Sequence, residues 1–199
     1  MEPRRRRGTS GCAIGAQPQV IRGGVIVFRT YDARFPFLWE TDDQPAARWH
    51  DEGEGPVHYF ADTPSGAWAE FIRHEEITDA DDLAGVHRAM CAVEIDPIEC
   101  VPVGHLPLTT LIGGEATYAE CQIAASEIRN AGHRGLRAPS AALKAGEARG
   151  MCVDQGIQDG PDRSGIVFVL FGRRPDLMGW QVTTQSRPPM QVLQQTRPI

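Results

Sequence analysis

The order of the expected strands and helices constrains the fold of this chain more than any other feature. Six segments are rich in β-branched and apolar residues and are therefore expected as strands. These segments are 21–29, 57–61, 90–103 (one or two strands around Pro97), 135–141 leading into a turn, 166–171 and 179–184. Two segments, 65–76 and 117–131, have the apolar spacing of amphipathic helices. Strands and helices do not alternate regularly, so the sequence predicts an α+β domain with mixed or largely antiparallel sheets and flanking helices.

The chain length of 199 residues fits one domain, and the sequence contains no internal repeat or long linker. The first segment is rich in Gly, Ser and Pro and carries a basic cluster at 4–7, which we interpret as part of a tail. We expect residues 1–20 to form a flexible N-terminal tail, 21–185 to form the domain, and 186–199 to form a loosely ordered C-terminal tail.

Composition argues against several classes of protein. A net charge of −6 is unlike a surface that coats nucleic acid, because phosphate binding needs clustered positive charge. The sequence has no apolar run near the ~20 residues that cross a bilayer, and no signal-peptide core follows the early arginines. The five cysteines are an odd number without a CxxC pair, which is typical of reduced thiols in a cytoplasmic protein.

Common catalytic and metal-binding motifs are missing. The chain has no GxGxxG after a strand, no phosphate loop with lysine, no HExxH and no GxSxG. Its six histidines have no convincing zinc spacing, and the acidic loop 154–162 departs from the calcium-loop pattern. The sequence therefore predicts neither a metal site nor a Rossmann-type nucleotide site.

One span, 47–70, crowds an arginine, two tryptophans, two histidines, a tyrosine and several acids around one strand and one helix start. It is either an ordinary mixture of surface and core or the wall of a pocket for a flat, charged ligand. Glu70 lies about 130° from the centre of the apolar helix face at ~100° per residue. Taken alone, it reads as a solvent-facing glutamate that could pair with His74, and Tyr59 reads as a core aromatic.

Five separated elements of the sequence together carry a resemblance. They are Arg29, Arg48-Trp49-His50, Gly55-Pro56-Val57-His58-Tyr59-Phe60-Ala61, Ala67-Trp68-Ala69-Glu70, and Gly135-Leu136-Arg137-Ala138-Pro139-Ser140-Ala141. Their order, from about 28 to 171, resembles the RES family, which typically shows an early arginine, GRWN, a strand with YxA, a helical glutamate and a late PSA. The chain departs from that pattern where Ala47, His50 and Thr30 stand in place of Gly, Asn and Tyr, with Tyr31 one position later.

The resemblance implies a fold like that of ADP-ribosyltransferase toxins and a toxin that attacks NAD, without a metal. It also implies a partner, an antitoxin with an Xre-type DNA-binding domain that blocks the pocket. The implied catalytic residues are Arg29, Glu70 and Ser140. The implied NAD-binding residues are Arg29, Arg48, Tyr31, Tyr59 and Ser140.

These residue types suit the chemistry that the resemblance implies. Cleaving the bond between nicotinamide and ribose leaves positive charge on the ribose, which a fixed carboxylate such as Glu70 stabilises. Arg29 and Arg48 offer planar forks for phosphate oxygens. Tyr59 could stack on nicotinamide, and Ser140 could bond to ribose or carboxamide.

Two other functions fit the same residues. A protein ADP-ribosyltransferase would use the same site with a protein as acceptor. A catalytically degenerate relative, which the departures at Thr30 and His50 permit, would use the pocket or its rim only to bind a partner.

Overall fold

The structure is a computed structural model, and it describes residues 23–198. The strands are β1 (Val25–Tyr31), β2 (Val57–Ala61), β3 (Arg88–Ile95), β4 (Cys100–Pro102), β5 (Gly135–Pro139), β6 (Met151–Val153), β7 (Ile157–Asp159), β8 (Ile166–Phe171) and β9 (Gly179–Ser186). The α-helices are α1 (Pro64–His74), α2 (Ala80–Leu83), α3 (Leu108–Ile112), α4 (Tyr118–Asn130) and α5 (Met190–Gln195). Two short 3-10 helices are η1 (Pro97–Glu99) and η2 (Glu115–Thr117).

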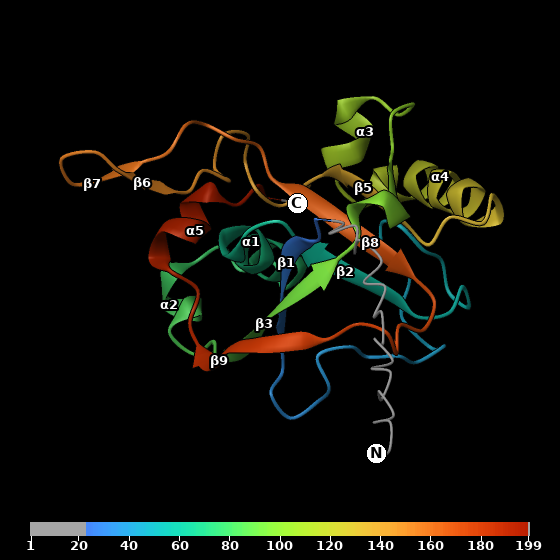
Figure 1. The fold of residues 1–199 in the computed structure, drawn as a ribbon, viewed down its shortest axis with the longest axis horizontal. Coiled ribbons are helices and arrows are strands. Elements are labelled where there is room, and N and C mark those ends of the chain that lie inside the picture. The colour runs from blue at the N-terminus through green and yellow to red at the C-terminus, as the bar shows by residue number, and fades with distance from the viewer. Residues whose placement is uncertain (1–22, 199) are drawn as a thin grey trace, which may run out of the picture.

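A seven-stranded sheet in the order β4-β5-β8-β2-β1-β3-β9 forms the centre of the fold (Figure 1). Each neighbouring pair is antiparallel except β4 and β5. Strands β6 and β7 form a separate hairpin that projects from the body (Figure 1, upper left). The expected α+β class, with a mostly antiparallel sheet and flanking helices, is confirmed.

The sheet nearly separates into two parts between β1 and β2. These strands pair only at Phe28 and Ala61, whereas β1 pairs with β3 from Val25 to Tyr31. Beyond that single contact, the end of β1 and the middle of β2 diverge. Side chains from both strands, including Tyr59, therefore face a gap instead of a continuous ladder.

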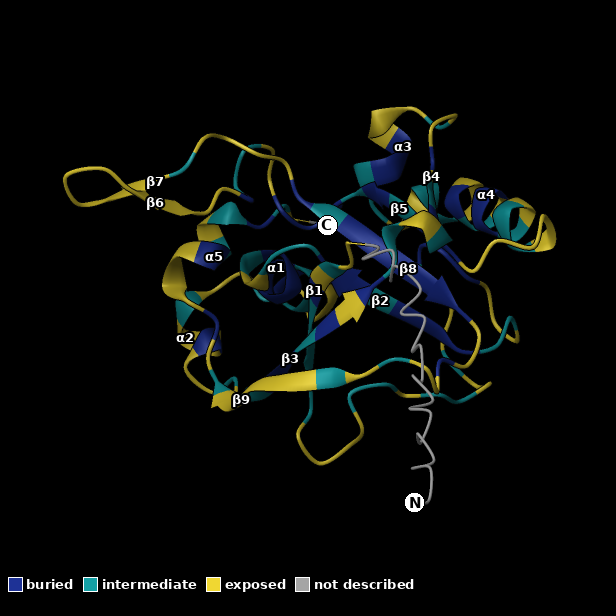
Figure 2. Ribbon diagram, in the orientation of Figure 1, coloured by how far each residue is buried: buried dark blue, intermediate teal, exposed yellow. Residues whose placement is uncertain are grey.

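Packing on both faces explains the unbroken apolar run of β8. Val169 packs in a cluster with Ala125 of α4, while Leu170 packs on the other face in a cluster with Val93 of β3. Successive residues of a strand point to opposite faces, so a strand covered on both sides needs apolar residues throughout. Figure 2 shows the result: β8 is buried over most of its length, whereas the edge strand β9 is largely exposed.

The end of the chain is more ordered than the sequence indicates. Within the expected tail 186–199, helix α5 packs against α1, and Val192 is only 1% exposed. The side chain of Arg197 donates to the carbonyl oxygens of Ser140 and Leu143 at 3.0 and 2.8 Å. A helix this short gives a weak periodic signal, and it is stable here because of tertiary packing. The expected tail 1–20 lies outside the described residues.

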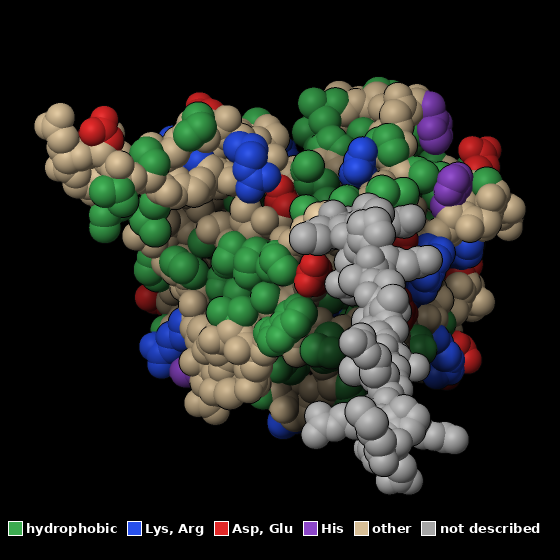
Figure 3. All heavy atoms as spheres, viewed as in Figure 1, with side chains coloured by type: hydrophobic (Ala, Val, Ile, Leu, Met, Phe, Trp, Pro, Cys, Tyr) green, Lys and Arg blue, Asp and Glu red, His purple; other side chains and the backbone are tan. Residues whose placement is uncertain are grey.

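The surface of the described part is mixed in charge. On the face seen in Figure 3, arginine and lysine side chains of the described residues lie scattered among acidic ones. Between residues 23 and 198, each helix is too short or too polar to cross a bilayer.

Candidate active site

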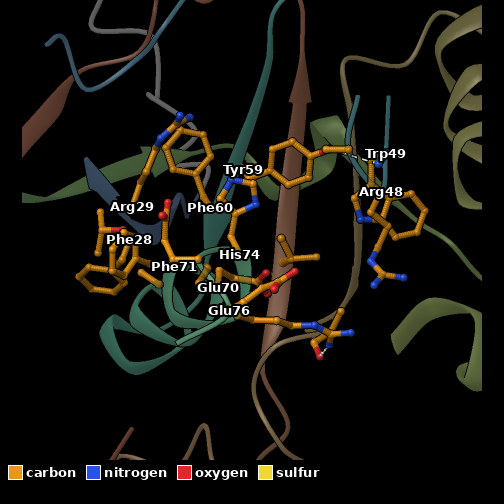
Figure 4. Close-up of a pocket in the computed structure, with 18 of the residues that line it drawn as sticks. Phe28, Arg29, Arg48, Trp49, Tyr59, Phe60, Glu70, Phe71, His74 and Glu76 are labelled. Atoms are coloured by element: carbon orange, nitrogen blue, oxygen red, sulfur yellow. Dashed lines mark hydrogen bonds between the residues drawn. The ribbon is translucent and has the colours of Figure 1, made fainter. Parts of the chain in front are cut away.

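A cavity of about 510 Å³ opens where β1 and β2 diverge, bounded below by α1 (Figure 4). Its charged and aromatic lining comes from β1, the segment before β2, β2 itself, α1 and the two residues after it, β3, η2 and the start of α4. The lining residues that matter for its chemistry include Arg29, Arg48, Tyr59, Glu70, Arg73 and Arg88. Residues far apart in the sequence, from Phe28 to Val167, therefore share one cavity.

Glu70 is positioned by the start of α1 and by a hydrogen bond from Ser140. The hydroxyl of Thr63 caps the helix by accepting from the backbone N–H of Gly66 at 3.0 Å, and Pro64 occupies the first turn. The helix then presents Glu70 two turns later on the cavity side. There, the Ser140 hydroxyl donates to Glu70 Oε1 over 2.9 Å.

The direction of that hydrogen bond follows from the contacts of Ser140. Its Oγ accepts the backbone N–H of Leu143 at 3.0 Å, and its own N–H donates to the Gly165 carbonyl at 2.9 Å. Because Oγ already accepts from Leu143, its proton is free to point at the carboxylate of Glu70. Ser140 is buried, so this geometry is shielded from water.

Burial raises the pKa of Glu70 above its ordinary value. The Ser140 hydrogen bond and the charges of Arg73 and Arg48 oppose the rise. A carboxylate in such a partly desolvated site interacts more strongly with a nearby positive charge than it would in water. Burial therefore disfavours the charged form of Glu70, while Ser140, Arg73 and Arg48 favour it.

Arg29 lines the same cavity from another wall (Figure 4). It follows Phe28, the last residue of β1 that pairs with β2. Its Nη1 is buried and has no hydrogen-bond partner among residues 23–198. Burial lowers the pKa of this guanidinium, although an arginine stays protonated at any physiological pH. A buried, charged donor without a hydrogen-bond partner lowers the stability of the fold. Such a donor is typical of a group that binds a ligand.

Arg48 is held by the protein itself. Its Nη1 donates to the Thr110 carbonyl and the Thr117 hydroxyl, each at 3.2 Å, and its Nη2 donates to the Gly113 carbonyl. Its guanidinium also lies 4.7 Å from the ring centre of Tyr118. Although Arg48 lines the cavity, these contacts occupy the fork that a phosphate would need.

The ring of Tyr59 also lines the cavity, and its hydroxyl is fixed behind it. That oxygen accepts the Trp49 backbone N–H at 3.1 Å and lies 2.9 Å from His50 Nδ1. Burial lowers the pKa of His50, which favours the neutral ring that can accept the tyrosine proton. Burial also raises the pKa of Tyr59, so the phenol stays protonated.

Tyr31 lies apart from Glu70. Its side chain packs on the other face of the sheet with Val27, and its hydroxyl accepts from Gln181 Nε2 at 3.1 Å. It lines a smaller cavity beside the large one. Of the residues that the sequence predicted, Arg29, Arg48, Tyr59 and Glu70 line the large cavity, Ser140 touches it through Glu70, and Tyr31 does not line it.

Two cavity residues, Arg73 and Arg88, were missed by the sequence reasoning. Arg73 follows Glu70 by three positions, so helical spacing could have placed both on one side of α1. Its Nη2 donates to the Gly113 carbonyl at 2.7 Å, and its Nη1 donates to the Ala141 carbonyl. Arg88 carries no comparable signal, because only the sheet brings it to the cavity.

One solved structure gives a comparison of the fold. A chain in the crystal structure of the M. tuberculosis MbcT–MbcA toxin–antitoxin complex is similar to this chain, with a TM-score of 0.56 and 14% sequence identity. The match covers 87% of this chain and 91% of that chain. At this identity, the likeness concerns the fold.

Sequence comparison points to a family. None of the curated proteins compared with the chain matches it. The family model of the RES domain, in contrast, matches residues 27–156, which include Arg29, Glu70 and Ser140. The match spans well over half of the chain, and this chain belongs to the RES domain family.

Proposed function

We propose that this chain is an NAD-consuming toxin that cleaves the nicotinamide–ribose bond by hydrolysis or phosphorolysis. We also propose that a cognate antitoxin with an Xre-type domain neutralises it. The RES family match supports this proposal. So does the fold, which is similar to that of a chain in a toxin–antitoxin complex.

The observation that carries the proposal is the joint placement of Glu70, Ser140 and Arg29. A partly desolvated carboxylate, oriented by a buried hydroxyl, lines the same cavity as a guanidinium with an unpaired donor. NAD carries matching features: a cationic nicotinamide on a ribose, and an anionic pyrophosphate. The cavity volume of about 510 Å³ lies within the usual range of small-molecule sites.

The proposed reaction breaks the C–N bond between ribose C1′ and nicotinamide. The bonding electron pair goes to the ring nitrogen, which leaves as neutral nicotinamide, while positive charge spreads over C1′ and the ring oxygen. The Glu70 carboxylate stabilises that charge, and Ser140 keeps the carboxylate oriented. A water or phosphate oxygen then bonds to C1′, and a water gives up its proton to Glu70 or to solvent.

Arg29 and Tyr59 have binding roles in this proposal. The free donor of Arg29 takes a pyrophosphate oxygen in a charge-assisted hydrogen bond. The flat face of Tyr59 stacks on nicotinamide, because its hydroxyl is already fixed by His50 and Trp49. Arg48 supports the wall instead of binding the ligand.

We further propose that the protein acts in the cytoplasm. Cys91, Cys100 and Cys121 are buried free thiols, and Cys152 is an exposed one. Free thiols of this kind are typical of a reducing compartment.

Liquid chromatography of NAD incubated with the purified protein tests the proposal. We expect release of nicotinamide by the wild type and a loss of about 10²–10³-fold in rate in Glu70→Gln. Adding phosphate distinguishes phosphorolysis from hydrolysis, because ADP-ribose 1″-phosphate then replaces ADP-ribose. If labelled ADP-ribose from NAD appears only on an added protein, the result would support the ADP-ribosyltransferase instead. If NAD stays intact with the wild type, with or without an added protein, the result would favour the partner-binding relative.

A further inference from the structure

A second cavity of about 150 Å³ lies next to the large one. The two cavities share Arg29, Thr30 and Arg88 as lining residues. The remainder of the smaller cavity comes from the end of β1 and the segment 32–39, and it includes the aromatic rings of Phe35 and Trp39. The two cavities are therefore adjacent compartments with arginines at their junction.

The junction holds two positive charges with free donors. Among the described residues, Arg29 Nη1 and Arg88 Nε are both buried without a hydrogen-bond partner. The two charges are close enough that Arg88 helps to lower the pKa of Arg29. The guanidinium carbon of Arg88 lies 4.6 Å from the ring centre of Phe71. The carboxylates of Glu75 and Asp32 partly offset the charge of Arg88. The free Nη1 of Arg29 and Nε of Arg88 still offer two donors to an anion that bridges them.

The aromatic wall of the smaller cavity is partly exposed, and the guanidinium carbon of Arg34 lies 5.7 Å from the ring centre of Phe35. The rings of Phe35 and Trp39 lie edge to face, 4.8 Å apart, and the residues are 44% and 46% exposed. The carbonyl of Trp39 accepts a 2.7 Å hydrogen bond from Gln44 Nε2, which helps to hold this segment in place. Aromatic faces of this kind stack on nucleobases without regard to their hydrogen-bonding edges.

We infer that the smaller cavity takes the adenosine end of NAD, with Trp39 and Phe35 against adenine and Arg88 joining Arg29 on the pyrophosphate. The inference rests on the proposed function. It follows from the order of groups in NAD, in which the pyrophosphate separates the nicotinamide ribose from the adenosine. With Glu70 in the large cavity, the phosphates fall at the shared arginines and the base falls in the smaller cavity.

The test compares NAD with nicotinamide mononucleotide, which lacks the adenosine half. We expect Trp39→Ala to raise KM for NAD about tenfold without changing kcat, because base stacking contributes ~1–3 kcal/mol. The same variant should leave turnover of nicotinamide mononucleotide unchanged. Its matched control is Trp180→Ala, which removes a tryptophan of similar exposure, 48%, from β9.

Arg88→Gln and inhibition by AMP extend the test. Arg88→Gln should lower kcat/KM for NAD about tenfold or more. Arg149→Gln, which changes an arginine just before β6 that lines neither cavity, should not. AMP should compete with NAD in the wild type and compete less well in Trp39→Ala and Phe35→Ala. Melting temperatures of all variants show whether each is folded, and Phe35→Ala provides an independent probe of the same wall.

The outcomes separate the two claims. If the wild type cleaves NAD but neither aromatic variant nor Arg88→Gln alters KM or AMP inhibition beyond the controls, the inference is wrong and the proposed function stands. If the wild type releases no nicotinamide from NAD, the proposed function is wrong and the inference falls with it.

Discussion

The two pairs of arginines around the large cavity differ in what they bind. Arg48 and Arg73, on the side of α3, donate to backbone carbonyls, and both reach Gly113. Arg29 and Arg88, at the opposite side, each keep a buried donor without a partner in residues 23–198. The first pair has the contacts of a scaffold. The second pair leaves hydrogen bonds unmade, which lowers stability unless a ligand completes them.

The comparison shows why residue type alone does not identify a ligand-binding arginine. In the sequence, Arg29 and Arg48 are both predicted to bind NAD, and Arg29 is also predicted to be catalytic, since both belong to the family pattern. Only the contacts of their guanidinium groups separate them. Substitutions of Arg29 and Arg48 test that separation directly.

Removing the unpaired guanidinium should damage activity and spare stability. We expect Arg29→Gln to lower the rate of NAD cleavage about 10²-fold, because it removes a charged donor from the proposed pyrophosphate site. Its melting temperature should equal or exceed that of the wild type, since a buried unpaired charge is lost. Nicotinamide release and thermal melting measure the two effects. A variant with a lowered melting temperature and a normal kcat/KM would show that Arg29 has a structural role, like Arg48, and does not bind the ligand.

Removing a paired guanidinium should do the reverse. Arg48→Met removes the Arg48 hydrogen bonds to the Thr110 and Gly113 carbonyls, of which the Gly113 carbonyl keeps Arg73 as a second donor. We expect a cost of about 2–4 kcal/mol in unfolding free energy. For a chain of this size, that corresponds to a fall in melting temperature of roughly 5–15 °C. KM for NAD should change less than in Arg29→Gln when both are measured well below the melting transition. An unchanged melting temperature with a large rise in KM would break the comparison.

The pH dependence of stability tests the electrostatics of Glu70. Its pKa is raised by burial in the folded state, so the folded chain holds this proton more tightly than the unfolded chain does. The buried charge of Glu70 therefore lowers the free energy of unfolding. This loss of stability is absent below the ordinary glutamate pKa of about 4.3 and reaches its full size as the pH rises through the pKa of the folded state. Glu70→Gln should therefore melt at a higher temperature than the wild type at pH 8, by a few degrees for each ~1 kcal/mol recovered.

The melting difference between wild type and Glu70→Gln should shrink as the pH falls toward 4. Calorimetry at several pH values measures it, with Glu120→Gln on α4 as the matched control. A difference that stays constant with pH would show that the substitution acts through packing and not through the charge. The same raised pKa predicts that NAD cleavage declines on the acid side at a higher pH than an ordinary glutamate would give.

The smallest effect is expected at Tyr59. Tyr59→Phe keeps the ring in the cavity but removes the oxygen that contacts Trp49 and His50. We expect a loss of about 1 kcal/mol in unfolding free energy and a change in KM for NAD below about threefold. Denaturant unfolding and steady-state kinetics check both. A large rise in KM would mean that the hydroxyl itself reaches the ligand.

Local patterns in the sequence account for much of the fold. The apolar run at 166–171 and the amphipathic spacing at 117–131 correspond to β8 and α4. The segment 90–103, expected as one or two strands around Pro97, forms β3 and β4, with the 3-10 helix η1 beginning at Pro97 between them. Helix α5 could not be predicted in this way, because its stability comes from contact with α1 and not from its own six residues.

The site depends on contacts that no local pattern encodes. Periodicity places Glu70 off the apolar face, and the structure agrees. Glu70 does not face open water, however, because it lines the cavity and accepts a hydrogen bond from the buried Ser140. The order of motifs predicted that Glu70 and Ser140 act together. Arg48 donates to carbonyls that are 62 to 65 residues away in the sequence, which only the fold brings near. The position of Arg88 in the cavity lining likewise follows only from the fold.

The most direct test of the account is nicotinamide release from NAD by wild type, Glu70→Gln and Arg29→Gln, measured side by side with Arg149→Gln as a surface control. The account predicts rapid release by the wild type and the control, and a loss of about 10²-fold or more in each of the two cavity variants. Equal rates in all four proteins, or NAD that stays intact with the wild type, would contradict it.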